Sequence, residues 1–286
     1  MRVARSRELV AQGRPAAVVA RVAGISRQAI YRRPKRPPRG QRRALDQTDR
    51  VVLEVARHNP TDGTRMVAAL ASRELAAAVN RKRVQRLMRE HQLLQPKRSE
   101  GRRRRPGYFQ VTRPDELWHL DMTSVWVAEH GWCYLNAAID CCTREIAAWG
   151  LDVRCRADEA IAVIDEAVID RRVRSQTLTL GTDNGTAYTS KRLRARLVEL
   201  GITHRRGGYR DPESQAFIES WFSKLKLRCV WREEFETLDE AREKIGRYID
   251  RYHHRPHQFL HYRTPKEVRQ TWEDARETEA LRNQAA

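Results

Sequence analysis

The spacing of hydrophobic residues changes character at about residue 114. Before that point, hydrophobic positions recur every three or four residues, which is typical of amphipathic helices. After it, residues 117–127, 131–142 and 145–154 form short runs rich in hydrophobic, β-branched and aromatic residues, which are typical of strands. The sequence therefore predicts an all-helical N-terminal region followed by a region of mixed α/β structure.

The mixed region predicts three successive strands in an antiparallel meander, followed by alternating helices and strands. Two more strands are expected at 177–185 and 202–206. Helices are expected at 157–173, 190–201, 211–230 and 238–255. The order β-β-β-α-β-α-β-α describes a mixed sheet with helices on its faces.

Residues 5–33 predict a helix-turn-helix unit. Ala20 is small enough to let two helices approach, Gly24 permits the turn, and Ile30 anchors the second helix to the first. Ser26 is the expected N-cap of the second helix. An ordinary helical hairpin is the alternative to a DNA-binding unit. The residues expected to face outward and meet the major groove are Arg27, Gln28, Tyr31 and Arg32.

Residues 46–95 predict a second helical DNA-binding unit. Val51 and Val55 belong to its helical repeat of hydrophobic positions, and Asn80 is the expected cap of its last helix. The polar face of that helix is uniformly basic, which favours DNA contact over the alternative of a solvated surface. The residues expected to contact DNA are Arg81, Lys82, Arg83 and Arg86.

The charge of the chain is concentrated in its first part. The formal net charge is +19, and residues 1–113 hold 29 Lys and Arg against 8 Asp and Glu. Residues 114–286 are near neutral, with 27 basic and 29 acidic residues. A basic segment joined to a near-neutral body indicates a nucleic acid as the partner. Four further arginines of a basic linker are expected to contact phosphates: Arg102, Arg103, Arg104 and Arg105.

These changes in composition predict five segments. A helix-turn-helix with a basic linker is followed by a second helical unit, another basic linker, a catalytic core and a C-terminal helical tail. The predicted boundaries are 1–45, 46–95, 96–113, 114–232 and 233–286.

Membrane and disulfide classes are not favoured by the sequence. It has no hydrophobic run of about 20 residues and no signal-like N-terminus. Its five cysteines are odd in number and contain no CxxC pair, which is typical of reduced thiols in a cytoplasmic protein.

Three acids stand out by their context. Asp121 and Asp183 lie where strand-like runs end in polar residues, and Glu219 lies on the helix expected at 211–230. If the two strands are neighbours, their carboxylates meet at one edge of the sheet. Converging carboxylates repel each other unless a cation lies among them, which indicates Mg²⁺ or Mn²⁺. A pair of such ions is a general device for phosphoryl transfer. For any single acid, a solvated carboxylate or a helix cap is the alternative.

Helical spacing also predicts the faces of the helix that carries Glu219. Ala216, Phe217 and Trp221 are expected to face the sheet, and Gln215, Glu219 and Lys226 to share another side. Two neighbours of the acids have expected roles as well. His119 should point to the same side of its strand as Asp121, and Gly185 should relieve backbone strain after Asp183.

Six sequence stretches together carry a family resemblance. They are WHLDMT, TDNGTAYTS, AFIESWFSKLK and YHHRPHQFLHYRTPKEV in the mixed region, and SRQAIYRR and VNRKRVQRLMREHQLL before it. On these stretches the chain resembles the integrase-core DDE transposases of bacterial insertion sequences, specifically the larger product of two-frame elements. The resemblance implies a ribonuclease-H-like mixed-sheet core preceded by helix-turn-helix units.

The resemblance also implies a chemistry. Asp121, Asp183 and Glu219 would be metal ligands for two Mg²⁺ ions, with Mn²⁺ as a substitute, in 3′-end cleavage of DNA and strand transfer. Lys226 matches a family lysine suited to hold DNA near the site, and a surface lysine is the alternative. The implied partners are the terminal inverted repeats of the element and the target DNA. A homodimer or higher oligomer on DNA and an upstream-frame helix-turn-helix protein are further partners, in the bacterial cytoplasm at the nucleoid.

Two other interpretations stay open. One is a non-catalytic DNA-binding regulator with a degenerate core, and the other is a structure-specific nuclease of the same fold. The sequence departs from the family in having Ser214, Gln215 and Ala216 where an Asn-Ala pair is usual, which concerns the positioning of DNA rather than the acids.

Histidines near the C-terminus form a candidate zinc set: His253, His254, His257 and His261. Pro256 interrupts their helical spacing, so a turn is favoured over a metal site.

Overall fold

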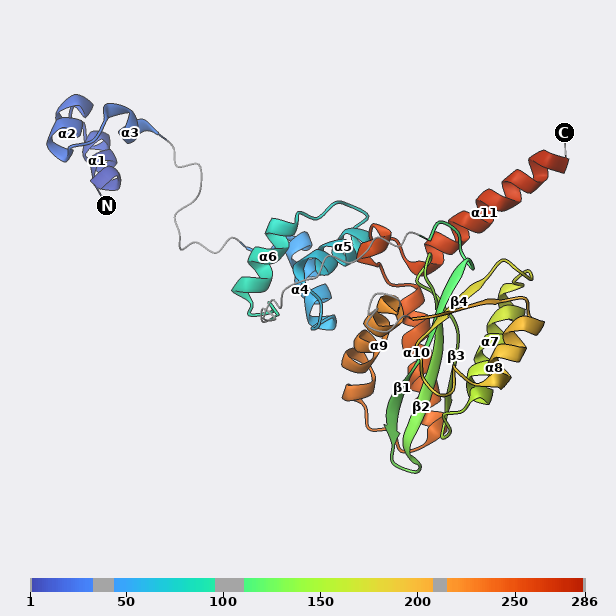
Figure 1. Cartoon of the computed structure of the whole chain (residues 1–286). Coiled ribbons are helices and arrows are strands. Elements are labelled where there is room, and N and C mark those ends of the chain that lie inside the picture. The colour runs from blue at the N-terminus through green and yellow to red at the C-terminus, as the bar shows by residue number, and fades with distance from the viewer. Residues whose placement is uncertain (1, 33–43, 96–110, 208–214, 285–286) are drawn as a thin grey trace. The chain divides into compact units, whose positions relative to one another are not determined.

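The computed structural model describes residues 2–32, 44–95, 111–207 and 215–284. The chain forms two compact units, Met1–Asp46 and Gln47–Ala286. Figure 1 shows the helices of the first unit and, in the second, a helical part followed by a sheet with helices on both faces. The change from helical to mixed structure lies where the hydrophobic pattern predicts it.

The first unit consists of helices α1 (Arg2–Ala11), α2 (Ala16–Ala23) and α3 (Arg27–Tyr31). Ala20 and Ile30 are buried at their contact. Gly24 ends α2 with a left-handed φ of 64°, a conformation that glycine adopts without steric cost. The Ser26 hydroxyl accepts a hydrogen bond from the Ala29 amide at 3.3 Å and so caps α3. The helices, turn and cap lie where the sequence predicts them.

The second unit begins with three helices, α4 (Gln47–His58), α5 (Thr64–Glu74) and α6 (Arg81–Glu90). The predicted cap of α6 is confirmed, because Asn80 Oδ1 accepts the Lys82 amide at 2.8 Å. The three helices enclose a small hydrophobic core of their own. Its fully buried members include Val52, Val67, Ala71, Val84, Leu87 and Met88.

A five-stranded sheet follows, with the order β3-β2-β1-β4-β5. β1, β2 and β3 pair antiparallel, whereas β4 is parallel to β1 and β5 is parallel to β4. The predicted mixed sheet is thereby confirmed. The strands span Leu117–Val127, Gly131–Asp140, Ile146–Asp152, Thr179–Thr182 and Thr203–Arg206.

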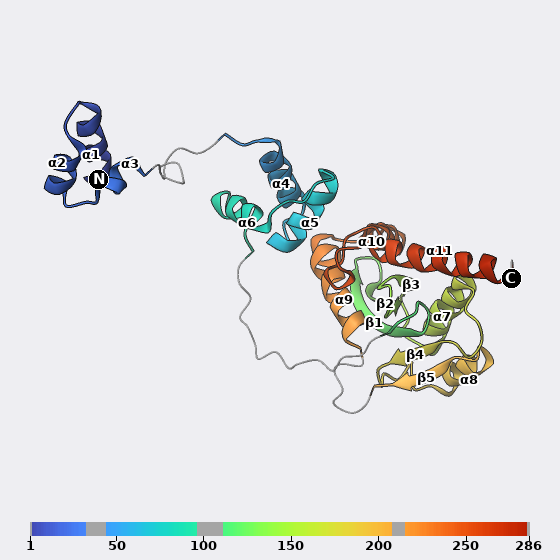
Figure 2. The same ribbon diagram turned by 90° about the horizontal axis from the view of Figure 1, so that it is seen from above.

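Helices cover both faces of the sheet (Figure 2). Trp118 and Leu120 of β1 pack in the hydrophobic cluster of α7 (Ala157–Arg171) and α8 (Lys191–Glu199). Val125 and Val127 pack on the opposite face with α9 (Ala216–Arg228) and α10 (Leu238–His253). Because side chains alternate along a strand, the odd-numbered residues of β1 point towards α9.

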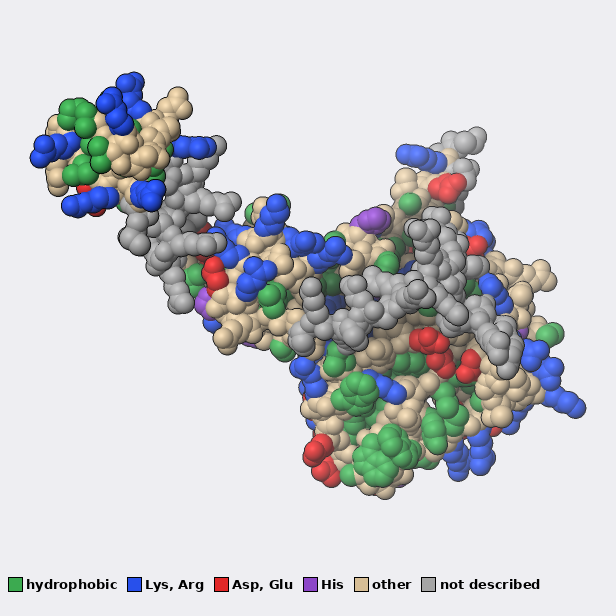
Figure 3. Space-filling model, turned by 60° about the vertical axis from the view of Figure 1, so that its left-hand side comes forward, with side chains coloured by type: hydrophobic (Ala, Val, Ile, Leu, Met, Phe, Trp, Pro, Cys, Tyr) green, Lys and Arg blue, Asp and Glu red, His purple; other side chains and the backbone are tan. Residues whose placement is uncertain are grey.

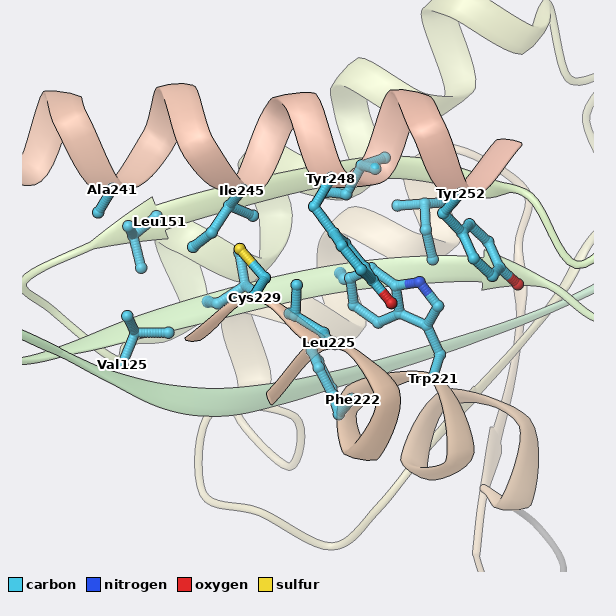
Figure 4. Packing of buried hydrophobic residues seen from close by; sticks show 14 of the residues in the cluster. Val125, Leu151, Trp221, Phe222, Leu225, Cys229, Ala241, Ile245, Tyr248 and Tyr252 are labelled. Atoms are coloured by element: carbon cyan, nitrogen blue, oxygen red, sulfur yellow. The ribbon is translucent and has the colours of Figure 1, made fainter. Parts of the chain in front are cut away.

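Hydrophobic residues of α9 and α10 interlock above the sheet (Figure 4). Trp221 lies between the helices, with its ring centroid 6.2 Å from that of Tyr252. The prediction for α9 was right for Trp221 and wrong for Ala216, which is exposed at the first position of the helix. The stripe that packs on the sheet recurs at helical spacing. It consists of Ile218, Trp221, Phe222 and Leu225.

The last helix, α11 (Pro265–Gln284), is fastened to the sheet by ion pairs. Arg269 Nη2 donates to both carboxylate oxygens of Asp115, at 2.7 and 2.8 Å, and Arg269 Nε donates to Glu145 at 2.7 Å. Arg171 of α7 donates to the same oxygen of Glu145 at 2.7 Å. One guanidinium therefore joins the helix to two nearly buried acids.

Short 3-10 turns precede and follow α10, at Val230–Arg232 and Gln258–Leu260. Within the described ranges, no helix has both the length and the hydrophobic character that crossing a bilayer requires.

We predict that Arg269→Ala destabilises the protein by about 3–5 kcal/mol, because it leaves the carboxylates of Asp115 and Glu145 short of a partner in a poorly solvated place. The free energy of unfolding in urea measures the loss. Arg282→Ala, at an exposed position of the same helix, is the matched control and should change stability by less than about 0.5 kcal/mol. Equal effects of the two substitutions would contradict the assigned role of Arg269.

Candidate active site

The register between β1 and β4 brings the two aspartates together. The parallel strands align Leu117 with Thr179 and His119 with Gly181. Continued for two residues beyond the last pair, this register would bring Asp121 opposite Asp183, the first residue after β4. The expectation that these strands are neighbours is confirmed, and both acids lie at one edge of the β1–β4 pair.

Local hydrogen bonds orient both carboxylates. Asp121 Oδ1 accepts the Met122 amide at 2.7 Å, and Asp183 Oδ1 accepts the Gly185 amide at 2.8 Å. The side-chain amide of Asn184 donates to the Gly207 carbonyl at 3.0 Å, which ties the loop after β4 to the end of β5. These two hydrogen bonds hold the start of the loop in place around Asp183.

Gly185 is needed for space rather than for backbone strain. Its φ lies outside the left-handed region, so the predicted relief of strain does not apply. A Cβ atom at this position would lie 3.0 Å from Asp183 Oδ1 and 3.4 Å from a ring carbon of Tyr188. The Tyr188 ring is buried, and its hydroxyl donates to Asn136 of β2 at 3.2 Å. Gly185 therefore lets the Asp183 carboxylate fold back against its own loop.

Glu219 lies in the first turn of α9, the helix that packs over β1 and β2. The three acids influence each other electrostatically. The pKa of Asp121 is raised to about 6, first by burial and then by the negative charges of Asp183 and Glu219, against the lowering effect of the Met122 amide. The α9 carboxylate is thus near enough to the strand pair to oppose ionisation of Asp121.

Three carboxylates without a cation among them suit a hard divalent ion, which prefers oxygen ligands. The negative charges of Asp183 and Glu219, which add to burial in raising the pKa of Asp121, are what such an ion would offset. They are not a preassembled metal cluster, however. Within the described ranges, no three His, Cys, Asp or Glu side chains lie close enough together to hold a metal ion. The donor chemistry therefore fits, while the carboxylates stand apart.

Aromatic and cationic side chains stack beside the acids. Phe217 of α9 lies 5.6 Å from the His119 ring, centroid to centroid, and 3.4 Å below the Arg144 guanidinium. His119 shares the side of β1 that holds Asp121, as predicted. Burial, followed by the charges of Arg144 and Arg205, lowers the pKa of His119 to about 4. His119 is therefore neutral at physiological pH and supplies no positive charge to the acids.

Gln215 is a feature of the site that sequence spacing did not predict correctly. It precedes α9 and was expected to share the side of Glu219, yet its side chain is buried. Neither of its amide atoms has a hydrogen-bond partner within the described residues. Its nitrogen would lie 3.5 Å from a Cβ placed on Gly181, so it sits against β4.

The sequence of the chain is similar to known integrase core domains and transposases. Two integrase core domain families match residues 111–212 and 200–265, and an HTH-like domain family matches residues 44–105. The chain is 30% identical over 161 residues to the transposase of insertion sequence element IS904 from Lactococcus lactis, covering 56% of this chain and 63% of that protein. It is 27% identical over 282 residues to the transposase InsD of insertion element IS2 from Escherichia coli, covering 92% of this chain and 93% of that protein. The chain belongs to the integrase core domain family, whose two models together match residues 111–265.

A chain from the cryo-electron microscopy structure of a simian T-cell lymphotropic virus intasome, in complex with a PP2A regulatory subunit, is similar in structure. It matches with a TM-score of 0.46 and 15% identity, covering 71% of this chain and 68% of that one. This likeness is too distant to assign residues.

The predicted recognition helix of this protein presents its polar residues to solvent. Arg27, Gln28, Tyr31 and Arg32 are exposed, and together with Ser26 they border a shallow hollow on α3. Figure 3 shows Lys and Arg side chains on the surface of this unit. The four residues are thus free to meet DNA, as predicted, and their contact with DNA remains a prediction.

The basic face of α6 divides into two groups. Arg81, Lys82 and Arg86 are exposed. Arg83 instead donates to the buried carboxylate of Asp49 on α4 at 2.6 Å, so its guanidinium helps hold the helices together.

Lys226 is half-buried on α9. The remaining predicted DNA contacts, Arg102, Arg103, Arg104 and Arg105, lie outside the described residues.

The four C-terminal histidines of this protein lie in separate local settings. His253 Nε2 accepts the Ile146 amide at 3.0 Å and so joins the end of α10 to the start of β3. His254 contacts the Asp250 carbonyl one turn earlier on α10, and His257 lies 3.5 Å from Lys224 Nζ. His261 follows the second 3-10 turn in a left-handed conformation.

We predict that the stabilising effect of His253 depends on pH. Burial lowers the pKa of His253 to about 4, below its usual 6.5. As pH falls below about 6.5, the unfolded chain binds a proton that the folded chain refuses until about pH 4, so folding loses stability across this window. At pH 7, His253→Ala should cost about 1–3 kcal/mol, because the Ile146 amide loses its acceptor.

The difference in unfolding free energy between wild type and His253→Ala, measured from pH 7.5 to 4, should shrink as pH falls. His254→Gln is the matched control, because His254 is exposed, and its difference from wild type should stay flat. A constant difference for His253→Ala would show that its protonation is not linked to folding.

Proposed function

We propose that this protein is the transposase of a bacterial insertion sequence, and that Asp121, Asp183 and Glu219 carry out 3′-end cleavage and strand transfer. The observation that supports this proposal is the pairing of β1 with β4, which brings Asp121 and Asp183 towards one end of the two strands, while α9 carries Glu219 near enough to act on Asp121. We propose that these three acids act on the same phosphate of the DNA substrate.

The three carboxylates would hold Mg²⁺, or Mn²⁺ in its place, and the bound ions would supply Lewis-acid activation of the attacking oxygen and charge neutralisation at the phosphorus. The contribution of the protein itself is to orient the carboxylates. The amides of Met122 and Gly185 fix the Asp121 and Asp183 side chains before DNA arrives, and rigid placement of this kind lowers the entropic cost of reaction.

Lys226 is proposed to hold DNA close to the acids. It follows Glu219 by seven residues on α9, so both side chains leave the helix on nearly the same side, about 20° apart. A lysine there would contact a phosphate near the one that is cut. The exposed arginines of α3 and α6 are proposed to bind the ends of the element through the grooves and the backbone.

Assembly on DNA is part of the proposal. Two element ends must be brought together for joining, which requires at least a homodimer on the terminal repeats and the target. A helix-turn-helix protein from the upstream frame is a further proposed partner, and the proposed location is the bacterial nucleoid. The two relatives are named as transposases for the elements IS904 and IS2, which supports an insertion element as the substrate.

Two other functions remain candidates. A non-catalytic regulator would bind DNA without cutting it, and a structure-specific nuclease would nick DNA without joining it. The oriented Asp121 and Asp183 side chains favour catalysis over regulation alone. Two separate helical units ahead of the sheet favour defined DNA ends over generic nicking.

We predict that Asp183→Asn and Glu219→Gln each lower the rate of Mg²⁺-dependent cleavage and strand transfer by at least about a thousandfold, since each removes a metal-binding charge while keeping size. The assay uses a labelled duplex that carries the terminal repeats found beside the gene. Asp170→Asn, an exposed acid at the end of α7, is the matched control and should keep the wild-type rate.

The products of this assay separate the three candidate functions. Strand-transfer products support the transposase, nicks without joining indicate the nuclease, and bound but uncut DNA indicates the regulator. Wild-type strand transfer by Glu219→Gln would sink the assignment of this acid.

A further inference from the structure

A group of basic side chains lies on the side of α9 away from Glu219. Its members come from the turn between β2 and β3, from the second half of α9, and from the segment after α10. We call it the α9 basic cluster, and it consists of Arg144, Lys224, Arg228, Arg255 and His257.

Short distances join the cluster. Lys224 Nζ lies 3.5 Å from His257 Nε2. Arg228 Nη2 donates to Asp62 Oδ1 at 2.8 Å, and Arg255 donates to the other oxygen of the same carboxylate. Asp62 lies in the turn between α4 and α5 and is buried, so the cluster borders the contact between the helical part and the sheet part of this unit.

The cluster has more positive charge than its surroundings balance. Arg144, Lys224, Arg228 and Arg255 are four cationic groups, and within the described part of the chain Asp62 is the one carboxylate that lies within 4.0 Å of any of their nitrogens. Lys224 and Arg144 have no such partner there. Burial, followed by the charges of Arg228 and Arg144, lowers the pKa of Lys224. Holding like charges together in a half-buried place is unfavourable by itself.

Donor atoms in the cluster are also left without acceptors. Four buried nitrogens have no hydrogen-bond partner among the described residues: Arg144 Nη1, Arg228 Nε, Arg255 Nε and His257 Nδ1. Buried donors in folded proteins are nearly always paired, so a group of four calls for an acceptor that the chain does not supply. Asp62 is the negatively charged partner of Arg228 and Arg255. It does not account for the positions of Lys224 and Arg144 or for the four nitrogens without an acceptor.

We infer that the α9 basic cluster binds one phosphate group of a DNA backbone. A phosphodiester carries the missing negative charge and offers oxygens to several N–H donors at once, and guanidinium groups match its geometry. Lys224 follows Glu219 by five residues, about 7.5 Å along the helix axis.

The inference rests on the proposed function only in taking DNA as the ligand. It assigns to α9 a second DNA contact, separate from Lys226, on the opposite side of the helix from the acids. Bound there, a phosphate would also join the helical part to the sheet part through Arg228, Arg255 and Asp62.

The test compares wild type with Lys224→Gln, which removes one charge and keeps most of the side chain. The matched control is Lys266→Gln, an exposed lysine at the start of α11. The probe is a fluorescent 30-base-pair duplex titrated with full-length protein in EDTA, so that cleavage does not enter the result. Lys224→Gln should reduce the slope of log affinity against log salt by about 1, and Lys266→Gln should leave it unchanged.

A second measurement identifies the source of the phosphate and excludes a purely structural lysine. In phosphate-free buffer, Lys224→Gln should raise the thermal unfolding midpoint by about 2–4 °C, because it relieves repulsion. Inorganic phosphate, compared with chloride at equal ionic strength, should raise the midpoint of wild type more than that of Lys224→Gln.

Three outcomes would overturn the inference. One is an unchanged salt slope, even with stabilisation by inorganic phosphate, which would make the cluster a site for free anions only. The second is a lowered midpoint of Lys224→Gln in phosphate-free buffer, which would make the lysine structural. The third is an equal effect of inorganic phosphate on both proteins. Because none of these measurements depends on cutting, inactive protein in the cleavage assay would leave their meaning intact.

Discussion

The burial of Asp121 near two other carboxylates is the constraint around which the candidate site is arranged. The parallel register of β1 and β4 sets Asp121 beside Asp183, and α9 brings Glu219 towards both. Burial raises the pKa of Asp121 to about 6, and the negative charges of Asp183 and Glu219 add to this rise. A folded protein tolerates such a cost where other contacts hold the groups in place, and strongly perturbed acids of this kind are concentrated at functional sites.

The surrounding fold supplies those contacts. β1 is the central strand of the sheet, and its alternation assigns Asp121 to the face that α9 covers. Trp221 and Leu225 hold α9 against α10 and the sheet, so the helix cannot retreat from the acids without opening the core (Figure 4). At the far end of the same helix, Arg228 meets Asp62 from the helical part. One helix therefore carries Glu219, closes the core and contacts the preceding helices.

Sequence patterns predicted the strands and their mixed order, because alternation and strand ends are local properties, and the expected pairing of the strand of Asp121 with the strand before Asp183 is confirmed. For α9 they predicted correctly that Trp221 faces the sheet, but Ile218 packs there as well and Ala216 is exposed at the first position of the helix. They did not predict that Arg83 pairs with Asp49, because a basic helix face looks the same whether one arginine turns inward or not. The buried charges around Lys224 depend on long-range contacts that spacing does not encode.

The account's central claim is that Asp121, Asp183 and Glu219 together hold divalent metal for DNA chemistry. Crystals of the protein bound to DNA and soaked in Mn²⁺ test it most directly, through the anomalous scattering of the metal. We expect an anomalous peak between the carboxylates of Asp121 and Asp183, with a carboxylate oxygen of Glu219 within about 2.5 Å of Mn²⁺. Mn²⁺ bound elsewhere, with no peak at the two aspartates in active crystals, would contradict it.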